Sequence, residues 1–148
     1  MAAGDAAYDP LGYHTGTVWP HDTSLAAQGL ARYGRWEEAW QLARSLLEAS
    51  TWFGGSWPEA FAGIPRRDSP FPVAYPVAGH PQAWGAGAVV LLLNVLLGLE
   101  PDATARVIGT VAPRVPEWLG DARLTGVRAF GKAWDVTAEG RRVRVDPS

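Results

Sequence analysis

The chain has 148 residues, a length typical of one domain whose core needs neither disulfides nor a structural metal, and short for an enzyme built as a closed barrel of helices. Thirteen Lys and Arg against fifteen Asp and Glu give a net charge of −2, which leaves no basic surplus for binding nucleic acid or an anionic membrane. The absence of cysteine excludes a disulfide framework, a thiolate zinc site and a cysteine nucleophile, while 47% hydrophobic residues and eight Trp argue against disorder.

The N-terminal residues and the most apolar stretch indicate where the protein works. Residues 1–7 lack the basic start and the apolar run of a signal peptide, so we expect a cytoplasmic protein. Residues 83–99 are strongly apolar but contain Gly and Asn94, and they are just too short for a bilayer span, which takes roughly 18–20 residues. We therefore expect no membrane contact and interpret this stretch as a helix buried on all sides.

The first half of the chain alternates between loops and helices. Residues 1–18 show no helical period and are expected to form a long loop. Residues 20–33 start with Pro and precede Gly34, which predicts a helix, and the apolar spacing from residue 36 to residue 48 predicts an amphipathic one. Residues 50–82 hold too much Gly and Pro for a long helix or a central strand, and their aromatic residues predict an ordered loop packed over a site.

The sequence changes character after the apolar helix. Alternating apolar and charged residues on both sides of Glu139-Gly140 predict a hairpin. We therefore expect a helical region over residues 1–104 and a β-hairpin element over residues 105–148, packed on the helices. Because so few elements cannot surround the apolar helix, we expect helices to associate between chains or the chain to be part of something larger. The short β-branched runs that predict strands are residues 107–111, 124–130, 133–137 and 143–145.

The densest cluster of polar and aromatic side chains lies at a loop-to-helix junction. Aromatic rings suit the apolar faces of sugars, and carboxylates suit their hydroxyls, so the cluster favours a polyhydroxyl ligand. Two other interpretations stay open: Asp22 could cap the helix while Trp19 anchors the loop, or His14, His21 and Asp22 could ligate a metal. The cluster comprises Tyr13, His14, Gly16, Trp19, His21 and Asp22.

A single carboxylate, Glu59, lies in a stiff apolar segment between Trp57 and Phe61. Desolvation there is expected to raise the pKa of the Glu59 carboxyl, which suits general acid or base catalysis near neutral pH. The alternative is a surface glutamate in a proline turn. A third and weaker group stands at the mouth of the apolar helix, where Gln82 could simply be another cap: it comprises His80, Gln82 and Trp84.

Three motifs in this order resemble the C-terminal part of bacterial glycogen-debranching, or amylo-α-1,6-glucosidase-like, proteins. They are YHTGTVWPHDTSL from Tyr13, SWPEAFAGIPRR from Ser56 and PVAYPVAGHPQAWGAGAVV from Pro72. The resemblance extends from about Tyr8 through the C-terminal strands. It points to the six-hairpin glycosidases, a superfamily that includes the mannosylglycerate hydrolases. It implies a mainly α fold, the C-terminal portion of an (α/α)6 toroid, with a small antiparallel β element at the C-terminus.

The resemblance also implies roles for individual residues and implies neither a cofactor nor a metal. Glu59 matches the general base of inverting members of the superfamily. Trp19, Trp57 and Trp84 would hold the glucosyl ring, while Asp22 and Gln82 would take its hydroxyls. The full set of implied substrate-binding residues is Tyr13, His14, Gly16, Trp19, His21, Asp22, Trp57, Gln82 and Trp84.

An inverting mechanism also needs a general acid, about 6.5–9.5 Å from the base across the scissile bond. In similar proteins this Asp lies well upstream of the first motif, whereas Tyr13 comes soon after Met1. We therefore expect a fragment that carries the base without the acid and is inactive alone. Its partners would be an oligo- or polysaccharide substrate and either a missing N-terminal part or another copy of the chain.

Three functional hypotheses follow. The first is a glycoside hydrolase of the debranching group that acts on α-glucosidic oligo- or polysaccharide by inverting hydrolysis. The second is a non-catalytic carbohydrate-binding or interaction module, and the third is a metal-dependent hydrolase that uses His14, His21 and Asp22.

Overall fold

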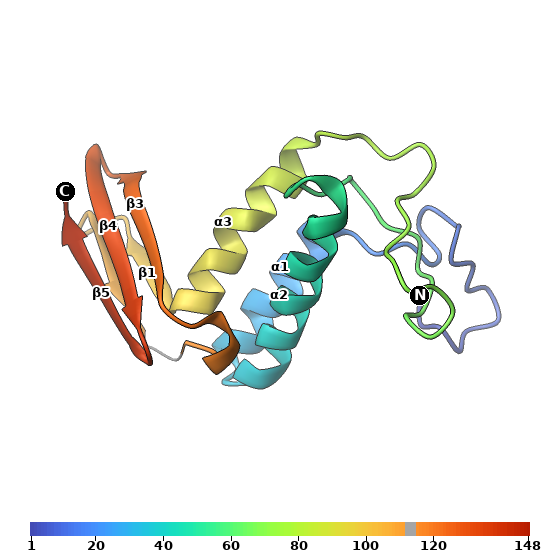
Figure 1. The fold of residues 1–148 in the computed structure, drawn as a ribbon, viewed down its shortest axis with the longest axis horizontal. Helices are drawn as coiled ribbons and strands as arrows, with labels where there is room; N and C mark the ends of the chain where they lie inside the picture. The colour runs from blue at the N-terminus through green and yellow to red at the C-terminus, as the bar shows by residue number, and fades with distance from the viewer. Residues whose placement is uncertain (112–114) are drawn as a thin grey trace. The chain divides into compact units, whose positions relative to one another are not determined.

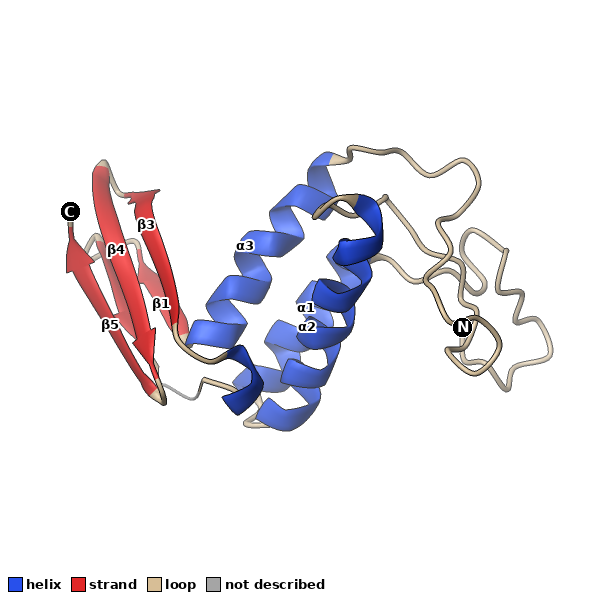
Figure 2. Cartoon of the chain, in the orientation of Figure 1, coloured by secondary structure: helices blue, strands red, loops and turns tan. Residues whose placement is uncertain are grey.

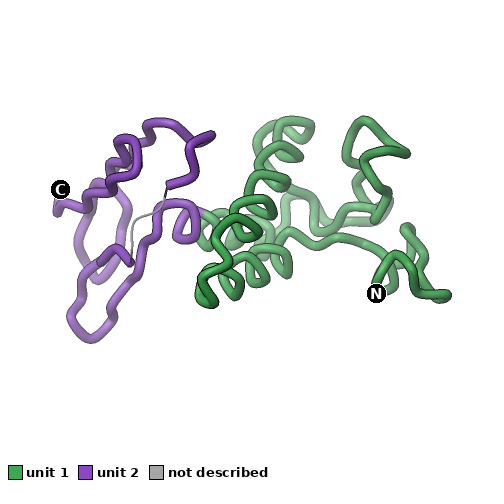
Figure 3. The backbone as a smooth tube through the Cα atoms, turned by 90° about the horizontal axis from the view of Figure 1, so that it is seen from below, with its two compact units in different colours: residues 1–92 green, residues 93–148 purple. Residues whose placement is uncertain are grey.

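A computed structural model describes residues 1–111 and 115–148. The described chain forms two compact units, Met1–Leu92 and Leu93–Ser148 (Figure 3). The three α-helices of the described residues come first along the chain and the strands follow them (Figures 1 and 2). The elements are the α-helices α1 (Pro20–Arg32), α2 (Trp36–Ser50) and α3 (Ala83–Leu97), the 3-10 helices η1 (Thr51–Phe53) and η2 (Glu117–Leu119), and the strands β1 (Leu99–Asp102), β2 (Val107–Thr110), β3 (Ala122–Ala129), β4 (Lys132–Glu139) and β5 (Arg142–Pro147).

This architecture overturns the fold expected from the resemblance. Residues 1–111 and 115–148 contain three α-helices and two antiparallel sheets, an α+β arrangement and not a mainly α portion of an (α/α)6 toroid. The expectation was wrong because it came from three short motifs, which specify local side chains and say nothing of how many helices accompany them. The residues between and after the motifs are rich in Gly, Pro and β-branched types, which form loops and strands.

The pair α1 and α2 forms the helical core of the first unit (Figure 1). Helix α1 begins with Pro20, whose fixed φ suits the first helical position, and it ends before Gly34, which takes the positive φ of 77° that turns the chain. The residues that face inward on α1 and α2 include Ala27, Ala39 and Ala43, all fully buried. Small side chains let the two helices approach closely. Both predicted helices are confirmed, since α1 and α2 lie where the sequence placed them.

The segment between α2 and α3 has little regular structure, yet its backbone is tied to the N-terminal loop. Val18 and Phe61 form an antiparallel bridge, and Phe61 forms a second one with Ala74. Where the loops cross, a Cβ on Gly63 would lie 1.9 Å from the carbonyl oxygen of Gly16, so only glycine fits there. The predicted loop over residues 50–82 is thus ordered, and it is joined to the segment that carries the first sequence motif.

Helix α3 differs from its prediction. Its residues were expected to be buried on all sides, but Val90 is 62% exposed, while Ala88 and Leu92 are buried on the opposite face. Trp84, in the first turn, is 59% exposed although it lies on the same stripe as Ala88 and Leu92. A sequence that is apolar all round does not reveal which stripe is covered, and here α1 and α2 pair with each other and leave part of α3 open. In the described part of the chain, every helix is too short or too polar to cross a membrane.

The second unit is built from strands. Strands β3, β4 and β5 form one antiparallel sheet in sequence order, and β1 pairs with β2 in another. Trp134, Val136 and Ala138 alternate along β4 and are buried, as the predicted hairpin pattern requires. The sequence did not predict β1, so the boundary expected after residue 104 falls in the turn between β1 and β2. The buried cluster that holds this unit together comprises Leu97, Val115, Val136 and Ala138.

Candidate functional site

Glu59 is held by donors from two segments that are distant in sequence. The Tyr13 hydroxyl donates a hydrogen bond to Glu59 Oε1 at 2.9 Å, and the Gly79 backbone N–H donates to Glu59 Oε2 at 3.2 Å. The backbone N–H of Glu59 in turn donates to the carbonyl oxygen of Gly79 at 2.9 Å. Both carboxylate oxygens are therefore oriented, while Glu59 itself is only half-buried. Each oxygen keeps a second acceptor position, so the carboxylate can also bind water or a ligand hydroxyl.

Aromatic rings surround the tyrosine that holds Glu59. The Tyr13 ring lies edge-on to His14 at 4.7 Å and to Trp19 at 4.8 Å between centroids, and 5.2 Å from Tyr75. The His14 and Trp19 rings are parallel, with centroids 6.0 Å apart. Edge-to-face and offset contacts at these separations are favourable, so the four rings form a coherent wall beside the carboxylate.

The backbone around the first motif fixes these rings. Thr17 donates its hydroxyl hydrogen to the carbonyl oxygen of Tyr13, and the same hydroxyl oxygen accepts from the Trp19 indole N–H at 2.9 Å. The hydroxyl of Tyr8 donates to the carbonyl oxygen of Gly63, which ties the first loop to the segment that carries Glu59. Thr17 therefore links the backbone of Tyr13 to the ring of Trp19.

The hydrogen bond to Glu59 and the nearby negative charge raise the pKa of Tyr13 above its usual value of 10.0. Tyr13 thus stays a protonated donor at neutral pH. We expect Glu59→Gln to lower the pKa of Tyr13, because an amide neither accepts as strongly nor repels a phenolate. Because the folded-state pKa is the higher one, this bond stabilises the fold below about pH 10 and is lost as the pH rises through the folded-state pKa.

The titration is measured by NMR with tyrosine labelled at Cζ. Tyr33, which is highly exposed, serves as the control tyrosine and should titrate alike in both forms. A Tyr13 pKa that does not change in Glu59→Gln would contradict the hydrogen bond.

A second pair of predicted residues lies at the N-terminal end of α3. The His21 ring of α1 stacks on the Trp84 ring of α3, with centroids 4.6 Å apart and an angle of 29° between planes. The carboxylate of Asp22 is exposed, and its Oδ2 lies 4.0 Å from His21 Nδ1. The exposed Trp84 ring and the Asp22 carboxylate are thus both accessible to a ligand.

Three of the residues predicted to bind substrate have roles in holding the fold together. Trp57 is only 5% exposed, and its indole N–H donates to the carbonyl oxygen of Leu46 at 2.7 Å, so its ring belongs to the core. Gln82 Oε1 accepts from the Gly85 N–H at 2.8 Å and thereby caps α3, the simpler of the two interpretations. Gly16 is buried where a Cβ would meet the carbonyl oxygen of Asp9 at 1.9 Å.

The residues offered as metal ligands do not converge. His14 packs on Tyr13 and Trp19, whereas His21 stacks on Trp84. Among residues 1–111 and 115–148, no group of three or more His, Cys, Asp or Glu is placed to hold a metal ion. The metal-dependent hypothesis therefore has no ligand set in this part of the chain.

Two residues of the site were not predicted. Tyr75 appeared in the sequence only as one aromatic residue of the long loop, and Gly79 contributes a backbone N–H, which no side-chain pattern reveals. Tyr75 belongs to the third sequence motif, and that motif was the available signal for it. No protein-family model matches the chain, and no curated protein sequence matches it significantly.

Proposed function

We propose that the chain acts on α-glucosidic oligo- or polysaccharide as a glycoside hydrolase of the glycogen-debranching group, with inversion at the anomeric carbon. Glu59 is the general base in this proposal. The observation that carries it is the Glu59 carboxylate, which is oriented through both oxygens by Tyr13 and Gly79 and lies beside a wall of rings.

The chemistry asked of Glu59 is proton removal from water. The water oxygen bonds to the anomeric carbon while the bond from that carbon to the leaving oxygen breaks, and Glu59 takes the proton that the water loses. The leaving oxygen must gain a proton from a general acid, and the proposal assigns no residue to that step. A base oriented by two fixed donors does not have to reorganise as the reaction proceeds.

Side chains of both groups, the one around Tyr13 and the one at the start of α3, support recognition of a sugar. The rings of Trp19 and His14 lie next to Tyr13. The exposed ring of Trp84 stacks on the ring of His21. Sugars place C–H groups on ring faces and hydroxyls on carboxylates, and Asp22 is exposed near His21. Trp57 and Gln82 are left out of the substrate contacts because the core and the helix cap engage them.

Hydrolysis of α-D-glucosyl fluoride tests the base without requiring the acid. Fluoride leaves without being protonated, so water attack assisted by Glu59 is sufficient for turnover. We expect fluoride release above the buffer rate, measured with a fluoride electrode, and β-glucose as the first product seen by NMR.

Two results would overturn the proposal. One is α-glucose as the first product, which excludes inversion. The other is fluoride release at the buffer rate while isothermal titration detects bound maltotriose, which would favour the non-catalytic carbohydrate-binding module.

A further inference from the structure

We infer that the first unit has a second ligand site, a cavity of about 510 Å³ that binds a neutral oligosaccharide. The cavity lies between α2 and the segment over residues 61–73, and its volume is within the range of about 300–1,000 Å³ usual for small-molecule sites. Of the residues predicted for substrate binding, not one lines it. Only the choice of an α-glucan as its ligand rests on the proposed function.

An aromatic platform opens into this cavity. Trp52 of η1 is 60% exposed and Phe71 is 50% exposed, and their ring centroids are 6.0 Å apart with planes tilted by 43°. The lining also includes the buried apolar side chains of Leu46 and Phe61. Large aromatic side chains left open to water are costly, and a ligand with apolar faces would cover them.

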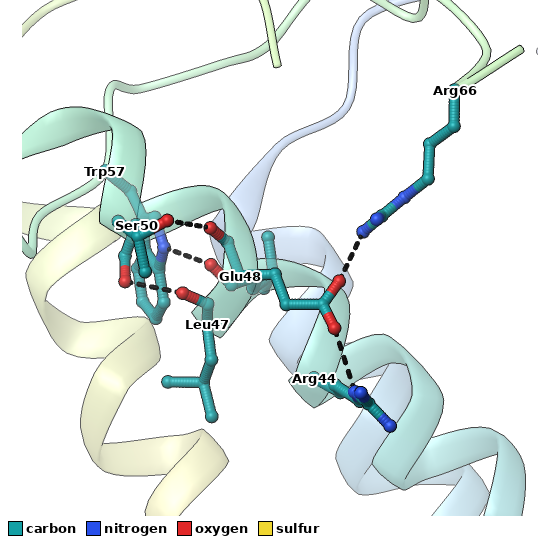
Figure 4. A network of polar contacts seen from close by, with 8 residues as sticks. Arg44, Leu47, Glu48, Ser50, Trp57 and Arg66 are labelled. Atoms are coloured by element: carbon teal, nitrogen blue, oxygen red, sulfur yellow. Dashed lines mark hydrogen bonds and ion pairs between the residues drawn. The ribbon is translucent and has the colours of Figure 1, made fainter. Parts of the chain in front are cut away.

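A charged bridge lies at the same cavity (Figure 4). Glu48 of α2 accepts from Arg44 Nε at 2.8 Å and from Arg66 Nη2 at 2.9 Å. Figure 4 shows Arg66 reaching from its loop to the Glu48 carboxylate on α2. The two arginines lower the pKa of Glu48 below its usual value, so it is ionised at neutral pH.

The lining favours a neutral polyhydroxyl ligand over an ion or a hydrocarbon. Glu48 and Arg66, the two charged residues that line it, have opposite formal charges, so the lining itself carries no net formal charge; Arg44, the other partner of Glu48, does not line the cavity. A hydrocarbon would cover the rings. It would also displace water from the charged bridge, and it has no polar groups to replace the hydrogen bonds that the bridge made to that water. A saccharide offers apolar ring faces to Trp52 and hydroxyls that both donate and accept, and these match a carboxylate beside a guanidinium.

The cavity and the Glu59 site use opposite sides of one extended segment. Val18 lines the cavity, whereas the next residue, Trp19, contacts Tyr13. Trp19 has extended backbone angles, with φ −100° and ψ 123°, and Val18 is bridged to Phe61. Neighbouring side chains in extended backbone point to opposite faces, so the two sites are separate.

The test is titration of the whole chain with maltotriose and isomaltotriose while the Trp indole N–H signals are followed by NMR. We expect the Trp52 signal to shift, and Trp52→Ala to weaken binding at this site by about tenfold or more. Phe71→Ala should act in the same direction. Tyr33→Ala is the matched control, because it removes another exposed ring, just after the end of α1, that does not line the cavity; circular dichroism checks that each variant is folded.

The outcomes separate this inference from the proposed function. Shifts confined to Trp19 and Trp84, with Trp52 unmoved, overturn the second site and leave the Glu59 proposal standing. Failure to hydrolyse glucosyl fluoride while Trp52 still reports binding overturns the Glu59 proposal alone. Binding of an apolar dye that Trp52→Ala abolishes, without any response to either sugar, shows a hydrophobic site and overturns the saccharide assignment.

Discussion

Glu59→Gln is expected to reduce the hydrolysis of α-D-glucosyl fluoride by about 10²–10⁴-fold, the usual contribution of a general base. Glutamine has nearly the same shape: its amide oxygen can accept from the Gly79 N–H while its NH2 group donates to the Tyr13 hydroxyl oxygen, so the loop should keep its path. The change therefore removes the proton acceptor and little else. The measurement is the rate of fluoride release over a range of glucosyl fluoride concentrations, which gives kcat and KM separately.

The matched controls isolate the role of Glu59. Glu38→Gln removes a carboxylate that pairs with Arg35 on the surface of α2 and should leave the rate unchanged. Tyr13→Phe removes one of the two donors to Glu59, and we expect a smaller loss of about tenfold, because the Gly79 N–H still holds the other oxygen. A Glu59→Gln variant with the wild-type kcat would exclude Glu59 as the base, whatever sugar the chain binds.

Local structure could be predicted from the sequence, because neighbouring residues determine it. Pro20 and Gly34 define the ends of α1, and the apolar spacing that follows defines α2. The alternation around Gly140 defines the last hairpin, where Glu139 pairs with Arg142. Each of these features depends on a period or a turn residue that a single sequence displays.

The arrangement in space could not be predicted in the same way. Tyr13 and Glu59 are 46 residues apart, and their hydrogen bond depends on how two glycine-rich loops cross. Helix α3 has no polar stripe, so its covered face depends on which neighbours reach it. The toroid expectation failed for the same reason, because motif residues describe a site and not the number of elements around it.

Two tryptophans that are close in sequence show why burial could not be predicted from residue type. Trp52 and Trp57 lie five residues apart in the same loop, yet one is open to water and the other is buried. Residue type and sequence neighbourhood do not distinguish them. The difference arises because the indole of Trp57 reaches back to α2, where it meets the carbonyl oxygen of Leu46 (Figure 4).

Trp57→Ala is therefore expected to lower the free energy of unfolding of the first unit by about 3–5 kcal/mol, the usual cost of deleting a buried aromatic side chain. The indole fills the space between α2 and the loop that continues to Glu59, and the carbonyl oxygen of Trp57 lies against α3, 3.5 Å from where a Cβ of Gly85 would be. Urea unfolding followed by helical circular dichroism measures the change. Trp57→Phe should cost less, about 1–2 kcal/mol, because it keeps most of the volume and loses the hydrogen bond.

Trp52→Ala is the natural control for this stability change, since it removes the same side chain from an exposed position of the same loop. Its free energy of unfolding should stay within about 0.5 kcal/mol of the wild type. Each variant should then change a different property: Trp57→Ala lowers the free energy of unfolding, while Trp52→Ala weakens sugar binding at the α2 cavity. Equal losses of stability in both variants would contradict the burial of Trp57. They would also contradict the course of the segment after α2, which places Glu59 next to Tyr13.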